Sequence, residues 1–178
     1  MLFQYNDFNV TIKKSKMKNI FLLIAISISM ATKAQVIKVS LQASGLTCSM
    51  CSNAINKALK SLDFVDKVDP DIKNYTFEIS FKEAGQIDFN KIRRKVEDAG
   101  FSVSGFVATI CFDNVYINAN QPIKIGNNTL LFAEVRDLSL NGVKQVRVLD
   151  QGFVASKEYK RNSVGSESSN TGLYHVSL

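Results

Sequence analysis

Two cysteines, Cys48 and Cys51, are the residues of this sequence best placed to do chemistry. They lie three positions apart in the stretch 45–51, which reads Gly-Leu-Thr-Cys-Ser-Met-Cys. A strand-like run precedes this stretch and a helical pattern follows it. The N–H groups and the positive dipole end of a helix start stabilise a thiolate, which both binds metals and attacks disulfides. Three interpretations follow: a soft-metal clamp, a redox pair and a structural disulfide.

The number of available ligands favours the clamp. Structural zinc normally takes four protein ligands, and residues 35–110 hold no third cysteine and no histidine. Two thiolates alone suit soft ions, above all Cu(I), with Hg(II), Ag(I) and Cd(II) close in chemistry and Zn(II) a weaker fit. A thioredoxin-like active site usually has Trp before the first cysteine and Pro before the second, whereas this chain has no Trp and places Met50 before Cys51.

The thiol pair must be positioned by a strand and a helix. Apolar and polar residues alternate over 36–43, which predicts a half-buried strand. Its predicted buried face carries Ile37, Val39, Leu41 and Ala43. After the cysteines, apolar residues recur with helical spacing, which predicts a helix with one buried stripe. That stripe consists of Ile55, Ala58, Leu59 and Leu62.

A hairpin and a second helix follow. Residues 64–69 predict a short strand stopped by Pro70, which cannot donate to a β-ladder. The next strand alternates, and its apolar positions are Tyr75, Phe77, Ile79 and Phe81, predicted as core. Asp88 is the expected N-cap of the second helix and Gly100 its expected C′ glycine. With a β-like run over 101–112, the order is β-α-β-β-α-β. We therefore predict an α+β, ferredoxin-like fold with two helices on one sheet face. The opposite face is predicted to be solvated and to carry Lys38, Ser40, Glu78 and Ser80.

With these elements in place, the sequence resembles the heavy-metal-associated domain family. Residues 45–51 are similar to the family's G-M-T-C-x-x-C signature, and Gly100-Phe101 is similar to the Gly-Phe/Tyr pair that packs beneath its metal loop. Leu46 replaces the usual methionine. The resemblance covers about residues 36–110. It implies that Cys48 and Cys51 are the metal ligands, as in copper chaperones, copper-transporting P-type ATPases and the periplasmic mercuric-ion binding protein. It also implies a metal-transfer partner, such as a P-type ATPase or another periplasmic metal protein, and a transient metal-bridged dimer.

The N-terminal segment 1–34 is expected to be a signal peptide. A lysine-rich stretch precedes the short apolar run 20–28, and small residues precede a plausible cut before Gln35. The apolar run falls short of the ~20 residues that a spanning helix needs, so we expect no stable membrane insertion after cleavage. Met17 precedes part of the lysine cluster, and residues 1–16 are interpreted as an over-long start.

The formal charge of the 178-residue chain is +6, from 22 basic and 16 acidic residues. Five of the basic residues and one acid lie in 1–34, which leaves 17 and 15 in the predicted mature chain. A nearly neutral mature protein gives no electrostatic case for nucleic-acid binding. We expect it in the periplasm or secreted.

The remainder, 111–178, is predicted to form a small β-rich region, either a small barrel or a meander packed on the domain 35–110. Val115–Ile117 is predicted as a separate strand, Asn141-Gly142 as a hairpin turn, 163–172 as a flexible polar stretch and the last six residues as an edge strand. The short basic stretch 157–161 is expected to be solvated.

Several residues have ordinary structural interpretations. We expect Cys111 to be a small buried core residue, with an auxiliary metal ligand or dimer-forming thiol as the alternative. Met50 is expected to be exposed or packed and His175 to fill a surface or edge strand, neither acting as a ligand. Phe101 is expected in the core.

The sequence predicts a non-enzymatic, exported protein that carries or sequesters Cu(I). The alternatives are a thiol–disulfide oxidoreductase that uses the same cysteines, a mercuric-ion binding or transport protein, and a structural domain with a vestigial metal loop.

Overall fold

The computed structural model describes residues 34–83, 85–118, 121–133, 137–162 and 172–178. These residues form eight strands and three helices. In chain order the elements are β1 (Ala34–Ser44), α2 (Ser49–Lys60), β2 (Val65–Asp71), β3 (Thr76–Phe81), α3 (Phe89–Asp98), β4 (Ser102–Ile117), β5 (Ile123–Ile125), β6 (Asn128–Phe132), β7 (Leu138–Val148), α4 (Ser156–Asn162) and β8 (Leu173–Ser177). Apart from Ala34, the predicted signal peptide lies outside the described residues, and so does 163–171. Among the described residues, no helix is both long and apolar enough to span a membrane.

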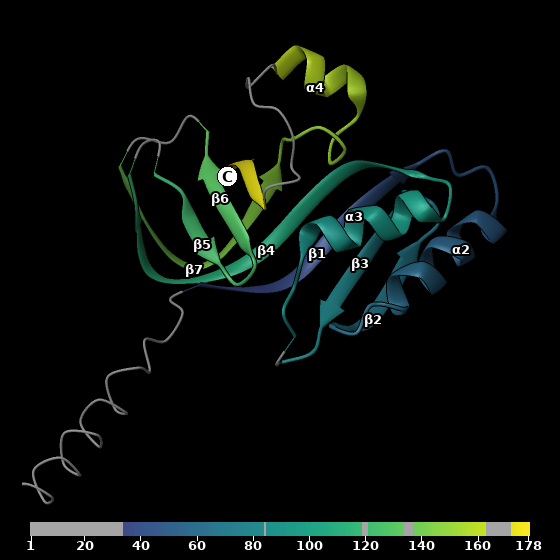
Figure 1. Ribbon diagram of the computed structural model, residues 1–178, viewed down its shortest axis with the longest axis horizontal. Helices are drawn as coiled ribbons and strands as arrows, with labels where there is room; N and C mark the ends of the chain where they lie inside the picture. The colour runs from purple at the N-terminus through teal and green to yellow at the C-terminus, as the bar shows by residue number, and fades with distance from the viewer. Residues whose placement is uncertain (1–33, 84, 119–120, 134–136, 163–171) are drawn as a thin grey trace, which may run out of the picture. The chain divides into compact units, whose positions relative to one another are not determined.

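All eight strands belong to one sheet, in the order β2-β3-β1-β4-β7-β8-β6-β5 (Figure 1). The first six elements have the β-α-β-β-α-β order of a ferredoxin-like fold, and α2 and α3 contact each other on one face of their strands. The α+β fold is therefore confirmed. The opposite face is solvated as predicted, and Lys38 forms a 2.9 Å salt bridge there with Glu78.

The second helix, α3, begins and ends as its sequence predicts. The side chain of Asp88 accepts a hydrogen bond from the backbone N–H of Lys91, which makes it the N-cap of α3. Gly100 has a φ of +88°, and its N–H donates to the carbonyl of Glu97. The N–H of Phe101 donates in turn to the carbonyl of Val96, which completes a Schellman ending.

The strand after α3 is longer than predicted. β4 runs without interruption through Val115–Ile117, which we predicted as a separate strand. A register shift against β7 lies between Phe112 and Val115, and Asn114 there has a φ of +48°. A bulge therefore bends the strand where the sequence indicated a break. β4 crosses the boundary predicted at residue 110, so both predicted segments share one sheet.

The C-terminal strands differ from the predicted meander. Asn141-Gly142, expected as a hairpin turn, lies inside β7, and Gly142 pairs with Phe112 beside the β4 bulge. β8 was expected at an edge but lies between β7 and β6, antiparallel to the first and parallel to the second. The basic stretch 157–161 lies within α4, and Lys157 and Lys160 are exposed there, as expected of a solvated stretch.

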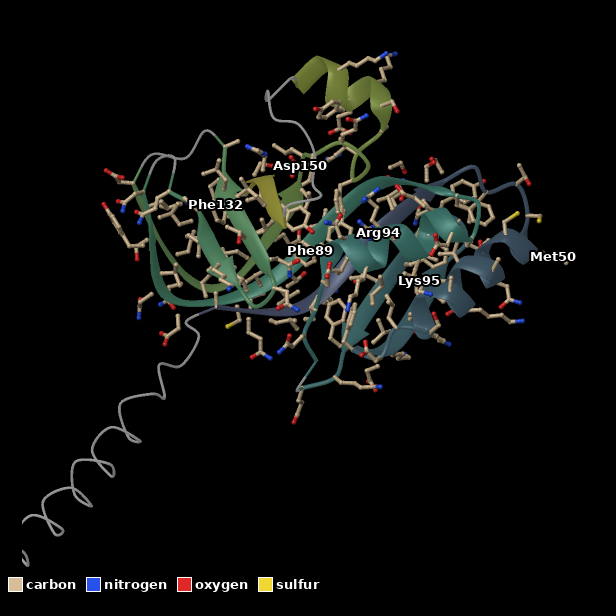
Figure 2. The ribbon with its side chains drawn as sticks, in the orientation of Figure 1. Met50, Phe89, Arg94, Lys95, Phe132 and Asp150 are labelled. Carbon is tan, nitrogen blue, oxygen red and sulfur yellow. The ribbon has the colours of Figure 1, made fainter. Side chains whose placement is uncertain are left out.

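One hydrophobic core joins the two predicted segments. Phe89 lies at the start of α3 (Figure 2). Its ring packs on Phe106 of β4 and on Tyr174 of β8, with ring centroids 5.0 and 5.4 Å apart. Phe153 meets Phe106 and Tyr174 edge-on, at 5.2 and 5.3 Å. The buried Asn128 of β6 accepts a hydrogen bond from the N–H of Phe89 at 3.1 Å. The C-terminal strands thus hold the first turn of α3.

Four burial or boundary predictions are wrong. Ile37 is 44% exposed, because a register shift between Val36 and Lys38 turns Val36 inward in its place. Cys111 is exposed, because it alternates with the buried Ile110 on β4. Tyr75 precedes β3 and is 47% exposed. β2 continues through Pro70 to Asp71, which is possible because β2 is an edge strand.

Candidate metal site

The loop that carries the thiols leaves the end of β1 and leads into α2. Gly45 begins it with a φ of +87°, a left-handed conformation that favours glycine. A Cβ atom at Gly45 would lie 3.8 Å from Cδ1 of Phe101, so the loop passes over that ring. The half-buried Leu46 packs against the core from the same loop. Leu46 and Phe101 thus give the loop an apolar floor, the role that the family resemblance implied.

The two cysteines occupy the first turn of the helix. Cys48 is the N-cap, in an extended conformation, and its side chain makes no capping hydrogen bond. The backbone N–H of Cys51 donates to the carbonyl of Cys48 at 3.1 Å. The two Sγ atoms lie 3.3 Å apart. Cys48 is exposed and Cys51 half-buried, and both are free thiols.

This separation defines what the pair can bind. The separation of 3.3 Å exceeds the ~2.05 Å of a disulfide bond, so the two sulfurs are not bonded to each other and each can act as a ligand. With metal–sulfur bonds of about 2.3 Å, a linear two-thiolate site needs sulfurs about 4.6 Å apart. To hold such an ion, the two sulfurs would have to move apart from 3.3 Å, and they lie at one exposed and one half-buried position. The donor set and its reach fit a soft ion with two ligands.

The pKa of Cys51 is lowered from its ordinary value of 9.0 to about 7. The largest cause is a backbone hydrogen bond from Thr47, and the second is the hydrogen bond with the Cys48 side chain. The Thr47 hydroxyl adds a smaller contribution from 3.9 Å. The loop therefore favours the thiolate of Cys51, the form that binds metal. Sequence reasoning had not assigned this role to Thr47, although its place inside the motif was a signal.

The other candidate ligands lie elsewhere or point away. Met50 is 79% exposed and projects outward from the start of α2 (Figure 2). Cys111 lies on β4, opposite Gln35 and Val143 on the neighbouring strands. Within the described part of the chain, no group of three or more His, Cys, Asp or Glu side chains could hold a metal ion. The structure thus brings together Cys48 and Cys51, the two residues predicted as ligands.

His175 has a structural partner in the C-terminal strands. Its Nδ1 atom lies 2.9 Å from Oδ1 of Asp150, and its backbone N–H donates to Oδ2 of the same carboxylate at 2.8 Å. Burial raises the pKa of Asp150, and the hydrogen bonds from His175 oppose that rise. His175 is therefore half-buried in an interior strand and does not fill the surface or edge position that we predicted.

Comparison with known proteins gives one family. The family model described as "Heavy-metal-associated domain" matches residues 40–102. A mercuric transport protein periplasmic component of Pseudomonas fluorescens is 33% identical over 66 residues, which are 37% of this chain and 71% of that protein. A probable copper-exporting P-type ATPase of Archaeoglobus fulgidus is 37% identical over 76 residues, 43% of this chain. The chain spans only 9% of that ATPase.

Among solved structures, oxidised MerP from Ralstonia metallidurans CH34 is 30% identical to this chain. The match covers 40% of this chain and 94% of that one, with a TM-score of 0.35.

Proposed function

Because the chain belongs to the heavy-metal-associated domain family, we propose that it is an exported protein that carries or sequesters Cu(I) between Cys48 and Cys51. The observation that carries the proposal is the pair of free thiols, 3.3 Å apart on the first turn of α2. A two-sulfur site with a lowered thiol pKa matches the preference of Cu(I) for few, soft, anionic ligands. The protein makes and breaks no bond of an organic substrate in this function.

Binding and release follow from the ligand count. As the ion enters, the thiols lose their protons, and Cys51 is already about half ionised at pH 7 because its pKa is about 7. A two-coordinate ion on an exposed loop can still be approached by a third thiolate. A partner can therefore take the ion by stepwise ligand exchange. A metal-transporting P-type ATPase or another periplasmic metal protein has suitable chemistry, and the similarity to a probable copper-exporting ATPase supports that class of partner.

The test is a Cu(I) titration of the reduced protein against a competing chelator. We expect one ion per chain in the parent. We expect a loss of affinity of at least tenfold in Cys48→Ser and in Cys51→Ser. Cys111→Ser is the matched control, because this third thiol is also exposed but lies on β4, away from the loop. Binding that survives both loop substitutions would refute the proposal.

A second candidate cargo is Hg(II), supported by the similarity to the mercuric transport protein periplasmic component. Hg(II) also accepts two thiolates, so the ligands are the same and the ions differ in affinity and in biological supply. Metal analysis of the protein purified from its native cells distinguishes the two. The cells are exposed to both ions before purification. Copper at near one equivalent per chain then supports the first proposal, and mercury supports the second.

Thiol–disulfide exchange is the alternative function from the enzyme class. The lowered pKa of Cys51 is the observation that favours it, because an attacking thiol works best with a pKa near the ambient pH. An insulin-reduction assay tests it directly. Turnover above the rate of free dithiol, abolished in Cys51→Ser, would support the enzyme, and a background rate would remove it.

Export is proposed from the N-terminal sequence and from the periplasmic relative. The expected outcome is a mature chain that begins at Gln35, measured by intact mass on protein from native cells. A mass that includes residues 1–34 would refute cleavage.

A further inference from the structure

One edge of β7 is open along most of its length. β4 pairs with β7 from Leu138 to Arg147. On the other side, β8 pairs only with Arg147 and Val148, because β8 ends at Ser177. Among the described residues, no other strand pairs with residues 138–146, and no loop forms a backbone hydrogen bond with them. We call residues 138–146 the open β7 edge, because one row of their backbone groups has no partner in this part of the chain.

The two outermost strands of the sheet are protected in ways that the open β7 edge is not. β2 contains Pro70 and the charged side chains of Lys67 and Asp69. β5, at the other end of the sheet, has only three residues. Proline, charge and shortness are the usual means by which native sheets avoid pairing with other chains. The open β7 edge is longer and carries one charged residue, Lys144. It is therefore the edge best suited to pair with another strand.

Exposed apolar side chains gather along the same edge. Leu138 is 38% exposed, Val143 is 58% exposed, and Leu178, which follows β8, is 50% exposed. A hollow of about 510 Å³ lies beside these residues, and its lining includes Leu138, Lys144 and Leu178. An added strand would cover apolar surface and pair the open backbone groups at the same time. The hollow and the open edge therefore point to one kind of occupant.

The direction of the open backbone groups follows from strand alternation. The N–H of Leu149 donates to the carbonyl of His175, next to β8 pairing. Every second residue of a strand directs its backbone groups to the same neighbour, and the pairing of β7 with β4 is regular from Gly142 to Arg147. The N–H groups of Val143 and Gln145 therefore point to the open side. Another extended chain is the partner that satisfies such a row of donors and acceptors.

We infer that the open β7 edge pairs antiparallel with the same edge of a second copy of this chain. The two-fold axis passes beside Gly142, so residues 138–146 of one copy lie along residues 146–138 of the other. This is the isologous geometry of most homodimers, in which one patch is its own complement. Glycine at the axis leaves room for the close approach of a second backbone, because it has no side chain.

The side chains of the edge are compatible with this self-pairing. Lys144, its one charged residue, faces Leu140 of the second copy, so the two lysines are not opposite each other. Leu138 faces Val146 of the second copy and reaches the hollow beside Leu178. The edge is thus matched to itself in length, in charge and in apolar contact. The dimer is independent of the proposed metal site, which lies on the loop after β1.

The test is sedimentation velocity of the metal-free, reduced protein carrying Cys111→Ser, over a wide range of concentrations. Removing metal and Cys111 excludes dimers bridged by an ion or by a disulfide at that thiol. We expect a reversible monomer–dimer equilibrium. Gln145→Pro removes one N–H from the open side and leaves the ladder with β4, so it should raise the dimer dissociation constant at least tenfold. Gln145→Thr is the matched control, since it keeps the N–H, and it should dimerise like the parent.

A pair of double substitutions tests the register. Ser139 and Gln145 are both exposed, and in the inferred register each faces the other across the two-fold axis. Ser139→Lys with Gln145→Lys places like charges opposite each other and should weaken the dimer at least tenfold. Ser139→Glu with Gln145→Lys places opposite charges there and should restore the parent constant. Both variants keep every backbone N–H, so they decide the question even if a lower urea midpoint shows that Gln145→Pro disrupts β7.

Three outcomes would overturn the inference. The first is a parent that stays monomeric, which includes the case in which the edge pairs with a strand of another protein. The second is a dimer of folded Gln145→Pro that is as tight as the parent dimer. The third is an equal weakening of the dimer by the two double substitutions, which would place residues 139 and 145 apart.

Discussion

The lowered pKa of Cys51 predicts how fast this thiol reacts at each pH. With a pKa of about 7, half of the Cys51 side chains are thiolate at pH 7, against roughly one in a hundred for a thiol at 9.0. That is about a 50-fold gain in thiolate. A thiolate of lower pKa is also a weaker nucleophile, by about tenfold for two pH units at a Brønsted slope near 0.5. The net expectation is alkylation of Cys51 about fivefold faster at pH 7 than of a reference thiol with a pKa of 9.0.

The same reasoning gives a crossover. At pH 9 the reference thiol is half ionised and intrinsically more nucleophilic, so it should react about fivefold faster than Cys51. The two rates should be equal near pH 8. The assay is timed iodoacetamide labelling of the metal-free, reduced protein, with the Cys51 peptide quantified by mass spectrometry. This separates Cys51 from the other two thiols.

A substitution separates the causes of the shift. Cys48→Ala removes the second-largest cause, the side-chain hydrogen bond from position 48, and leaves the first, the backbone of Thr47. The labelling midpoint, which is the pH at which Cys51 is labelled at half its maximal rate, should therefore rise but stay below 9.0. A midpoint near 9.0 in the parent would refute the role of the loop. An unchanged midpoint in Cys48→Ala would refute the contribution of the neighbouring thiol.

Four further substitutions at three positions test the packing by urea unfolding. Asn128→Ala removes a buried side chain that accepts from the N–H of Phe89, so we expect a loss of about 1–3 kcal/mol, and a loss under 0.5 kcal/mol would contradict the capping role. Asp150→Ala should cost a similar ~1–3 kcal/mol, because two donors of His175 lose their acceptor. Since the folded-state pKa of Asp150 is raised, its contribution to stability should fall as pH rises through that value, and Asp150→Asn should remove this slope. Cys111→Ser should change stability by less than about 0.5 kcal/mol, whereas a clear loss would place this thiol in the core.

The sequence predicted the elements around the thiols well, because each depends on local rules. Asp88 and Gly100 are capping residues whose effect is confined to one helix turn. Alternation in the β3 strand places Phe77 and Ile79 inward as expected. Cys48 and Cys51 are three positions apart on one helix turn, so their separation in sequence already brings their side chains close together in space. The sequence therefore located the thiol pair without tertiary information.

The failures come from contacts between strands. The β1 register shift exposes Ile37, and the β4 bulge at Asn114 turns a predicted break into one continuous strand. The sequence Asn141-Gly142 is typical of a hairpin turn, but the pairing of Gly142 with Phe112 of β4 keeps it inside β7. The exposure of Tyr75 depends on where the hairpin turn ends. None of these features can be read from one segment alone, because each is fixed by a partner strand distant in sequence.

The arrangement of α3 explains why metal binding and stability can be tested separately in this chain. The helix begins at Phe89, where Asn128 and the aromatic side chains of the C-terminal strands hold it. It ends at Asp98, and Phe101, which follows the C′ glycine Gly100, lies under the thiol loop. Ten helical residues separate the two ends by about 15 Å. Substitutions at the C-terminal packing should therefore lower the free energy of unfolding without moving the sulfurs, so a loss of Cu(I) affinity at Asn128→Ala in fully folded protein would show that α3 transmits strain to the site.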